Sequence, residues 1–409
     1  MEELLFLAHR IPYPPNKGDK IRSYHLLKEL ARSYRVHLGA FVDDPDDRHY
    51  RGKLEALCES VFLLDLHPLL ARVRSLSGLL RGEALSVPYY FDRRMKAWVD
   101  DLLACSSLQR VFVFSSPMSQ YVMDIQGRSI RRIIDFVDVD SDKWRQYAER
   151  KSWPASWVYS REGRQLLRYE KEVAGRFDAS VFVSADEAAL FQRQAPEVSS
   201  HVDFIDNGVD HEYFSPDRDY PDPYTGNMPV LVFTGAMDYW ANIDAVSWFA
   251  QDVFPRIREA VANVQFFIVG ARPTAEVLRL AEIPGVTVTG AVADIRPYLA
   301  HARAAVAPLR VARGIQNKVL EAMAMAVPVL ATSAAMEGIE YNSPVGLQVS
   351  DDERLFADMA IWLLQQDGSQ LIRTSRQWVC QRHDWEINLN KLYELFESFP
   401  GQPQNLTRT

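Results

Sequence analysis

A cluster of basic and amide side chains follows a short apolar run in the last third of the chain. The run 304–307 is typical of a strand, Gly314 of a turn, and a helix is expected to open near Ile315 with Lys318 in its first turn. A helix amino end carries unpaired N–H groups and positive potential, so a lysine there is unfavourable unless an anion lies beside it. This pattern indicates phosphate binding. The candidate residues are Arg310, Arg313, Gly314, Ile315, Gln316, Asn317 and Lys318.

Glu321 lies one helical turn beyond Lys318 on the same face. Its carboxylate is therefore within reach of a hydroxyl group on the molecule that carries the phosphates. A second interpretation stays open, in which Lys318 and Glu321 form a charge pair on a solvated helix and the two arginines form surface salt bridges.

Other kinds of site lack their signatures. There is no Gly-x-Gly, no Walker lysine loop, no Gly-x-Ser-x-Gly and no histidine pair at metal-ligand spacing. The formal net charge of −8 argues against a nucleic-acid partner. The start of the chain is acidic where a signal peptide is basic, and no apolar stretch is long enough to span a bilayer. The three scattered cysteines favour a reducing compartment, so a cytoplasmic location is expected.

Two further positions carry alternatives. Asp138 and Asp140 form an Asp-x-Asp that would suit Mg²⁺, but we favour a helix cap or a substrate-binding carboxylate over a metal site. His9 follows the first apolar run and is interpreted either as a residue that contacts substrate or as a hydrogen-bonded structural histidine.

The elements that must position these residues form two α/β domains. The chain length favours two domains. Short apolar runs alternate with helical patterns, which predicts parallel sheets. A hydrophilic, proline-bearing stretch begins near residue 215 and separates the two series. The predicted strands are 4–8, 36–42, 61–66, 111–114, 133–136 and 179–183, then 230–233, 264–269, 286–288, 304–307 and 327–330.

Two helices carry particular expectations. In the first helix, the apolar stripe from Ile21 to Tyr34 predicts that the basic side chains point outward. These side chains are Lys20, Arg22, Lys28 and Arg32. The last helix has a stripe running from Trp385 to Phe399, and it either completes the second core or crosses back to the first domain. The expected domains are therefore 1–214 and 215–384, followed by a C-terminal helix and tail, 385–409.

Two segments resemble a known family at the expected separation. The segment 318–324 (KVLEAMA), continued by 327–332 (VPVLAT), and the segment 205–216 (IDNGVDHEYFSP) resemble the retaining GT-B glycosyltransferases of family four, also called group 1. More narrowly, segments 9–22, 135–144 and 235–244 resemble the sugar transferases that accompany bacterial exosortase (PEP-CTERM) and exopolysaccharide loci.

The resemblance implies a GT-B fold, with two Rossmann-like doubly wound domains facing a central cleft, and a nucleotide-sugar donor held mostly by the second domain. It assigns the donor ribose to Glu321, the phosphates to Lys318 and the nucleobase edge to the turn from Gly290 to Val292; Gly235 lies on the donor side. The expected acceptor-side or diphosphate residues are His9, Lys17, Gly18, Asp19, Lys20 and Asp138. No cofactor and no tightly held metal ion are implied.

The sequence departs from the family pattern in two places. Arg313 stands where a glutamate usually touches the transferred sugar, and segment 235–249 lacks the usual basic pair. We therefore expect Arg310, Arg313 and Lys318 to meet the diphosphate charge and to serve as the catalytic groups.

The expected function is transfer of a sugar from a nucleotide diphosphate to a saccharide or polyprenyl-linked acceptor in exopolysaccharide or other surface-polysaccharide synthesis. A nucleotide-sugar epimerase of the same architecture and a noncatalytic sugar-binding protein are the alternatives. The stretch 67–96 carries a net charge of +4, and its apolar residues line one face of a predicted helix. Such a helix fits peripheral contact with the inner face of the cytoplasmic membrane, or it packs on the first sheet with its arginines in water. The base, the sugar, the acceptor and the oligomeric state are not determined by the sequence.

Overall fold

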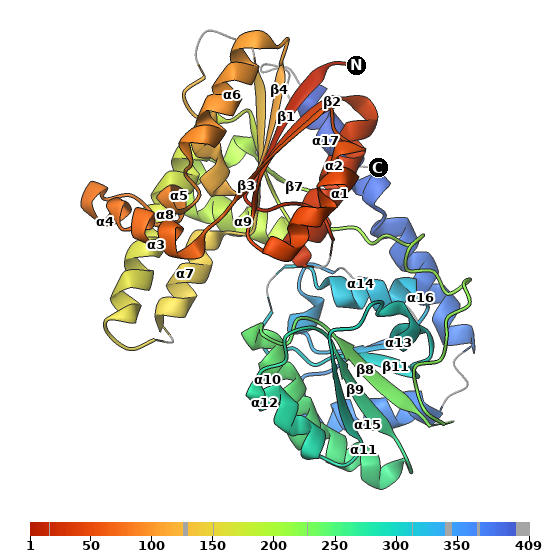
Figure 1. The fold of residues 1–409 in the computed structure, drawn as a ribbon. Helices are drawn as coiled ribbons and strands as arrows, with labels where there is room; N and C mark the ends of the chain where they lie inside the picture. The colour runs from red at the N-terminus through yellow and green to blue at the C-terminus, as the bar shows by residue number, and fades with distance from the viewer. Residues whose placement is uncertain are drawn as a thin grey trace. The chain divides into compact units, whose positions relative to one another are not determined.

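The protein consists of two compact α/β units (Figure 1). The computed structural model describes residues 1–15, 17–125, 130–149, 151–226, 228–312, 314–339, 346–365 and 369–397. Unit 1 contains Met1–Asp206 together with the chain from Leu389 onward, and unit 2 contains Asn207–Asn388. None of the described helices combines the length and the hydrophobicity needed to cross a bilayer.

Unit 1 is built on a parallel sheet with the strand order β3-β2-β1-β4-β5-β6-β7. Its strands are β1 (Glu3–Ala8), β2 (Arg35–Val42), β3 (Ser60–Asp65), β4 (Arg110–Phe114), β5 (Arg131–Val137), β6 (Ala179–Phe182) and β7 (Val202–Phe204). Its helices are α1 (Gly18–Ser33), α2 (Arg51–Glu55), α3 (Pro68–Ser75), α4 (Ser77–Arg81), α5 (Ser86–Tyr89), α6 (Arg93–Cys105), α7 (Asp140–Glu149), α8 (Ala155–Arg176) and α9 (Ala185–Gln194).

Unit 2 has a second parallel sheet, with the order β10-β9-β8-β11-β12-β13. Its strands are β8 (Val230–Thr234), β9 (Gln265–Val269), β10 (Val286–Gly290), β11 (Ala304–Ala307), β12 (Val329–Ala331) and β13 (Leu347–Val349). Its helices are α10 (Trp240–Trp248), α11 (Phe254–Ala260), α12 (Ala275–Arg279), α13 (Arg296–Ala300), α14 (Asn317–Ala324), α15 (Glu353–Gln365) and α16 (Ser369–Arg382).

All eleven predicted strands are present, and the expectation of two parallel α/β sheets is confirmed. Two strands were not predicted, β7 and β13, which have three residues each and lie at sheet edges. β12 is equally short but is buried along its whole length, whereas β7 and β13 are each buried at one residue only, so they lack an apolar run in the sequence. Their pairing with β6 and β12 defines them.

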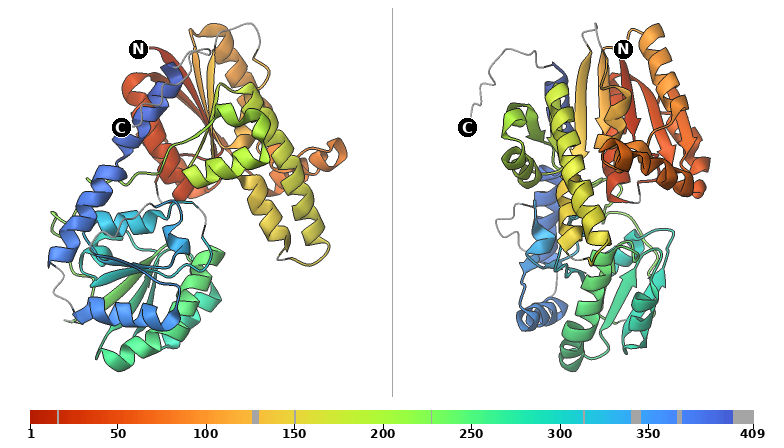
Figure 2. Two further views of the ribbon diagram at one scale, coloured as in Figure 1. Left: turned by 180° about the vertical axis from the view of Figure 1, so that it is seen from behind. Right: turned by 90° about the vertical axis from the view of Figure 1, so that its left-hand side faces the viewer.

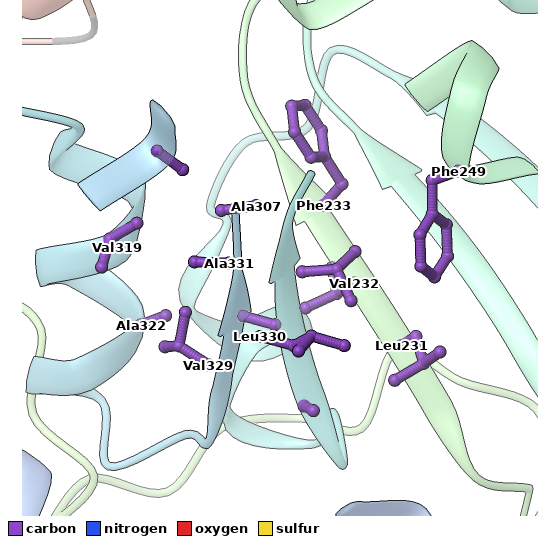
Figure 3. Close-up of a cluster of buried hydrophobic side chains, with 14 of the residues drawn as sticks. Leu231, Val232, Phe233, Phe249, Ala307, Val319, Ala322, Val329, Leu330 and Ala331 are labelled. Atoms are coloured by element: carbon purple, nitrogen blue, oxygen red, sulfur yellow. The ribbon is translucent and has the colours of Figure 1, made fainter. Parts of the chain in front are cut away.

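The core of unit 2 covers both faces of its central strands. Val319 and Ala322 of α14 pack on one side of the sheet, whereas Phe249 lies on the other (Figure 3). Leu231, Val232 and Phe233 of β8 are fully buried in succession. A strand covered on both faces reads as a continuous apolar run, which is why the sequence located it well.

The expectation that α1 directs its basic residues into water is wrong at two positions. Lys20 and Arg22 have 1% and 0% of their surface exposed. The Arg22 Nε donates to Asp135 Oδ2 at 2.7 Å and its Nη1 donates to the Ile205 carbonyl at 2.7 Å. Lys20 pairs with Asp47. Burial of these two charges is tolerated because each finds an acidic partner distant in the sequence.

The division between the units differs from the expected boundary at 214/215. Residues 207–214 belong to unit 2, because Val209 and Phe214 are buried in its core and the Arg376 guanidinium donates to the Phe214 carbonyl at 3.0 Å. Val209 N also donates to the His383 carbonyl at 2.7 Å. The linker region is therefore held by contacts with α16 and the residues that follow it.

The last helix, α17 (Trp385–Glu397), is divided between the units. Trp385 packs against Gly208 in unit 2. From Leu389 onward the helix packs on unit 1 beside α1, where Tyr393 Oη donates to the Glu29 carbonyl at 2.9 Å and the Phe396 ring lies against Tyr34. Phe399 lies outside the described residues.

Candidate functional site

The candidate site lies at the carboxyl edge of the unit 2 sheet. The chain runs outward from β8 through β9 to β10, and then returns to the other side of β8 as β11, β12 and β13. The carboxyl ends of β8 and β11 therefore form the point at which the strand order reverses. Ligands of open α/β sheets bind outside such a point. The segments that follow these two strands begin with Gly235 and Pro308.

Backbones approach closely at this edge, and glycine makes the approach sterically feasible. A Cβ atom on Gly270 would lie 1.7 Å from the Gly235 carbonyl oxygen. A Cβ atom on Gly235 would lie 2.8 Å from Asn242 Nδ2 and 3.3 Å from Lys318 Nζ. Gly235 therefore allows Asn242 and the Lys318 ammonium group to lie close to its backbone.

Lys318 is fixed by an amide and an aromatic ring. Its Nζ donates to Asn242 Oδ1 at 2.6 Å and lies 4.1 Å from the centre of the Phe233 ring. Asn242 is buried, and its Nδ2 donates to the Ala236 carbonyl at 2.9 Å, which turns the oxygen towards Lys318. Burial lowers the pKa of Lys318 to about 7, although the nearby charge of Glu321 acts in the opposite direction.

The Glu321 side chain shares this environment. Burial raises its pKa to about 7, and the charge of Lys318 acts to lower it. In the part of the chain that the structure describes, no ion pair joins the two side chains; the ammonium group bonds to Asn242. The solvated charge pair considered as an alternative is therefore not formed. An anion that binds beside this lysine would favour its protonated form and raise its pKa.

The other predicted residues around the α14 amino end have definite places. Gly314 adopts a left-handed conformation with φ 61°, as its role in a turn requires. The Gln316 Nε2 donates to the Gly314 carbonyl at 3.1 Å, and Asn317 Oδ1 accepts from Asn207 Nδ2 at 3.3 Å. Ile315 is buried. The helix begins at Asn317, two residues later than expected, and its first turn holds no acidic residue.

The two arginines differ from Lys318. The Arg310 guanidinium forms a two-point ion pair with Asp244 of α10, with Nε 3.0 Å from Oδ2, and half of its side chain is exposed. This ion pair is the surface salt bridge that the sequence analysis gave as the alternative for Arg310. Arg313 lies outside the described residues. Asn242, which the sequence analysis missed, is the hydrogen-bond partner that orients Lys318.

The turn after β10 is also at the carboxyl edge. Gly290 has φ 70°, a left-handed conformation that favours glycine, and its carbonyl accepts from Gly270 N at 3.2 Å. Val292 is partly buried against the unit 2 core. This turn is where the nucleobase is expected from the sequence. The hydrogen bond from Gly270 holds the turn beside the end of β9.

In unit 1, the residues after β1 form a charged cluster. His9 Nε2 lies 3.4 Å from Asp19 Oδ2, and Arg10 Nη1 lies 2.9 Å from the same oxygen. Burial acts to raise the pKa of Asp19, but the hydrogen bond from His9 and the Arg10 charge hold that pKa well below its ordinary value. The His9 ring stacks on Phe114 at a centroid distance of 5.9 Å.

The amino end of α1 carries the other predicted residues. Lys17 immediately precedes the helix, which begins at Gly18. A Cβ atom on Gly18 would meet nothing within 4 Å, so packing does not require glycine there. The Lys20 charge, expected to face a diphosphate, is instead neutralised by buried Asp47.

Asp138 and Asp140 are bound by a lysine. Lys143 Nζ lies 2.6 Å from Asp138 Oδ2 and 3.1 Å from Asp140 Oδ1. Burial acts to lower the pKa of Lys143, but the charges of the two aspartates raise it well above its ordinary value. Among the described residues, no group of three or more histidine, cysteine or acidic side chains is arranged to hold a metal ion.

Comparison with known proteins bears on the segment that contains this site. Residues 228–366, which include β8 to α15, match a family model. The family is that of glycosyl transferases group 1. Its match covers the Lys318 site of unit 2, and group 1 motifs were also the basis of the resemblance described above. Among curated proteins, no match to the sequence is found.

Solved structures share the architecture of the whole chain. Sucrose-phosphate synthase from Thermosynechococcus elongatus superposes with a TM-score of 0.69 at 17% identity, covering 97% of this chain and 98% of that one. HepE of Anabaena in complex with UDP-glucose gives 0.64 at 16% identity, covering 98% and 100%. WaaG, a glycosyltransferase involved in lipopolysaccharide biosynthesis, gives 0.62 at 15%, covering 97% and 100%. The fold is GT-B, with two Rossmann-like α/β domains.

Proposed function

We propose that this protein is a retaining glycosyltransferase that moves a sugar from a nucleotide diphosphate to a saccharide or polyprenyl-linked acceptor during surface-polysaccharide synthesis. One observation carries the proposal. Lys318 is held by Asn242 at the reversal point of the unit 2 sheet, with a depressed pKa and with the backbone of Gly235 close to its ammonium group. This arrangement suits a diphosphate.

The donor contacts follow from that position. The Lys318 ammonium group and the N–H groups that open α14 would bind the diphosphate, because both direct positive potential to one place. Glu321, one turn along the helix, would accept a hydrogen bond from a ribose hydroxyl, and the turn from Gly290 to Val292 would meet the base. Arg310 and Arg313 remain proposed as additional phosphate ligands; for Arg310 this requires exchange of Asp244 for the phosphate.

Catalysis would consist mainly of stabilising the leaving group. Cleavage of the bond between the sugar and the diphosphate releases a nucleoside diphosphate, whose oxygens gain negative charge as the bond breaks. A preorganised donor aimed at those oxygens typically contributes about 3 kcal/mol to the barrier reduction. The departing phosphate would take the proton of the acceptor hydroxyl on the same face of the sugar, so the proposal needs no enzyme nucleophile and no metal ion.

The compared proteins support the donor and the biological role. HepE was crystallised with UDP-glucose, and WaaG takes part in lipopolysaccharide biosynthesis. We place the reaction in the cytoplasm, with acceptors supplied at the inner face of the membrane. On unit 1 the charged cluster of His9, Asp19 and Arg10 is the proposed acceptor side.

The test is a panel of nucleotide sugars incubated with the protein and a membrane extract, scored for nucleotide release and for labelled lipid or saccharide. We expect acceptor-dependent release with one donor, lost in Lys318→Ala and reduced in Glu321→Ala through weaker nucleotide binding. Lys391→Ala is the matched control, because Lys391 also lies 4.1 Å from a phenylalanine ring but on unit 1. A changed sugar without acceptor dependence would instead show an epimerase, and sugar binding without turnover a binding protein.

A further inference from the structure

In helix α3 of unit 1, the large apolar side chains are exposed to solvent and the small side chains are buried. Leu69, Leu70 and Val73 are 75%, 67% and 68% exposed, whereas the small residues Ala71 and Ser75 are buried. A surface helix of a water-soluble protein normally buries its large apolar residues and exposes the small or polar ones. Leu69, Leu70 and Val73 therefore do not pack on the first sheet, although Ala71 of the same helix belongs to the unit 1 core. Instead of one helix, the chain forms the short helices α3, α4 and α5.

Further large apolar side chains are exposed on elements near α3. Leu76, between α3 and α4, is 55% exposed. Near the start of α8, Trp153 and Trp157 are 81% and 55% exposed. Arg161, one helical turn after Trp157, donates through Nη2 to the Gly78 carbonyl of α4 at 2.8 Å, which ties the two elements together. The α3–α4 segment and the α7–α8 hairpin project from the same side of unit 1 (Figures 1 and 2).

The charge of this surface is opposite to that of the whole protein. Segment 68–82 contains three arginines and no acidic residue, although the chain carries a formal net charge of −8. Arg72 and Arg81 are exposed beside the leucines, and Lys151 is exposed beside Trp153. Arg74 donates to the Pro88 carbonyl at 2.7 Å, so its role is to hold α3 against α5.

We propose that α3, α4 and the amino end of α8 form a monotopic docking surface for an anionic lipid bilayer. The leucine and valine side chains insert at the boundary between headgroups and acyl chains, the tryptophans lie at the level of the headgroups, and the arginines bind lipid phosphates. The basic charge disfavours a two-fold dimer through this surface, because the arginines of the two copies would face each other. The anionic headgroups of a bilayer complement the arginines, and its acyl chains accept the apolar side chains. The surface lies wholly on unit 1 and does not depend on the proposed transfer reaction.

The test is flotation of the full chain with vesicles of zwitterionic lipid alone or with one third phosphatidylglycerol, without nucleotide sugar. We expect binding to the anionic vesicles and little to the zwitterionic ones. The triple variant Leu69→Gln, Leu70→Gln, Val73→Gln should weaken binding at least about 100-fold, because three exposed apolar side chains no longer enter the bilayer. Arg72→Gln with Arg81→Gln should weaken it about 25-fold, at roughly fivefold for each basic residue.

The matched control is Leu278→Gln with Leu355→Gln, which alters apolar residues that are 52% and 48% exposed on unit 2. It should bind vesicles like the unmodified chain. Because every altered residue is exposed, thermal unfolding should stay unchanged in all variants. No binding to anionic vesicles, or equal loss in the control, would overturn the proposal. So would a concentration-dependent dimer in analytical ultracentrifugation that the triple variant abolishes, since the surface would then be an interface between copies.

Discussion

The depressed pKa of Lys318 predicts that binding of the nucleoside diphosphate product weakens steeply as pH rises above neutrality. A diphosphate binds the charged ammonium form, so its affinity follows the fraction of free protein in which Lys318 carries a proton. With a pKa of about 7, that fraction falls from about one half at pH 7 to about one hundredth at pH 9. The expected loss of affinity is therefore about 50-fold, or about 2.3 kcal/mol.

Glu321 titrates in the same range and does not reverse this trend. Its pKa of about 7 means that it passes from about half to fully ionised between pH 7 and pH 9, which changes affinity at most about twofold. A lysine with its ordinary pKa of 10.5 would give almost no change over that interval. The pH dependence therefore reports the burial of Lys318.

The assay is isothermal titration calorimetry with UDP, GDP and ADP, using the tightest of the three, at pH 7, 8 and 9. Lys318→Met should bind more weakly at pH 7 and should lose the dependence on pH. Lys391→Met, which removes a lysine from unit 1, should keep it. A flat profile in the unmodified protein, or the same slope in Lys318→Met, would refute the placement of the diphosphate at this lysine.

Two predictions concern stability, each measured by urea unfolding. Gly270→Ala places a Cβ atom 1.7 Å from the Gly235 carbonyl oxygen and should lower the free energy of unfolding by about 3 kcal/mol or more. Gly52→Ala, whose Cβ atom would meet nothing within 4 Å, should be neutral or stabilising. Equal effects of the two substitutions would contradict the close approach of Gly270 to Gly235. Arg22→Met leaves the carboxyl group of Asp135 buried without its guanidinium partner and should cost about 3–5 kcal/mol; a loss below about 1 kcal/mol would show that the pair contributes little.

Much of the fold was predictable because it depends on short-range patterns. The central strands are continuous apolar runs, and strands alternating with helices specify parallel sheets, so β1 to β6 and β8 to β12 were located from the sequence. The short edge strands β7 and β13 carry no such pattern. The boundary between the units was expected at 214/215, where a hydrophilic stretch begins, but contacts with α16 and with residues near its end hold residues 207–214 in unit 2.

The candidate site was only partly predictable. The turn at Gly314 and the helix that carries Lys318 follow from local sequence. The Asn242 partner is 76 positions away, and an uncharged amide gives no signal that it will bind an ammonium group. Arg310 had two interpretations in the sequence, and its pairing with Asp244 became visible only when α10 was brought beside it.

By itself, the sequence determined which segments become strands and helices and that a lysine opens a helix beyond β11. Both follow from the periodicity of neighbouring residues and from helix-end chemistry. Only the tertiary structure decided which charges are buried and what they meet. Lys20 and Arg22 were expected to face water, yet both are buried. Lys20 pairs with Asp47 and Arg22 pairs with Asp135, and both aspartates belong to other elements. The stability of a buried charge depends on its spatial partners, and their positions follow from the packing of the whole sheet and its helices.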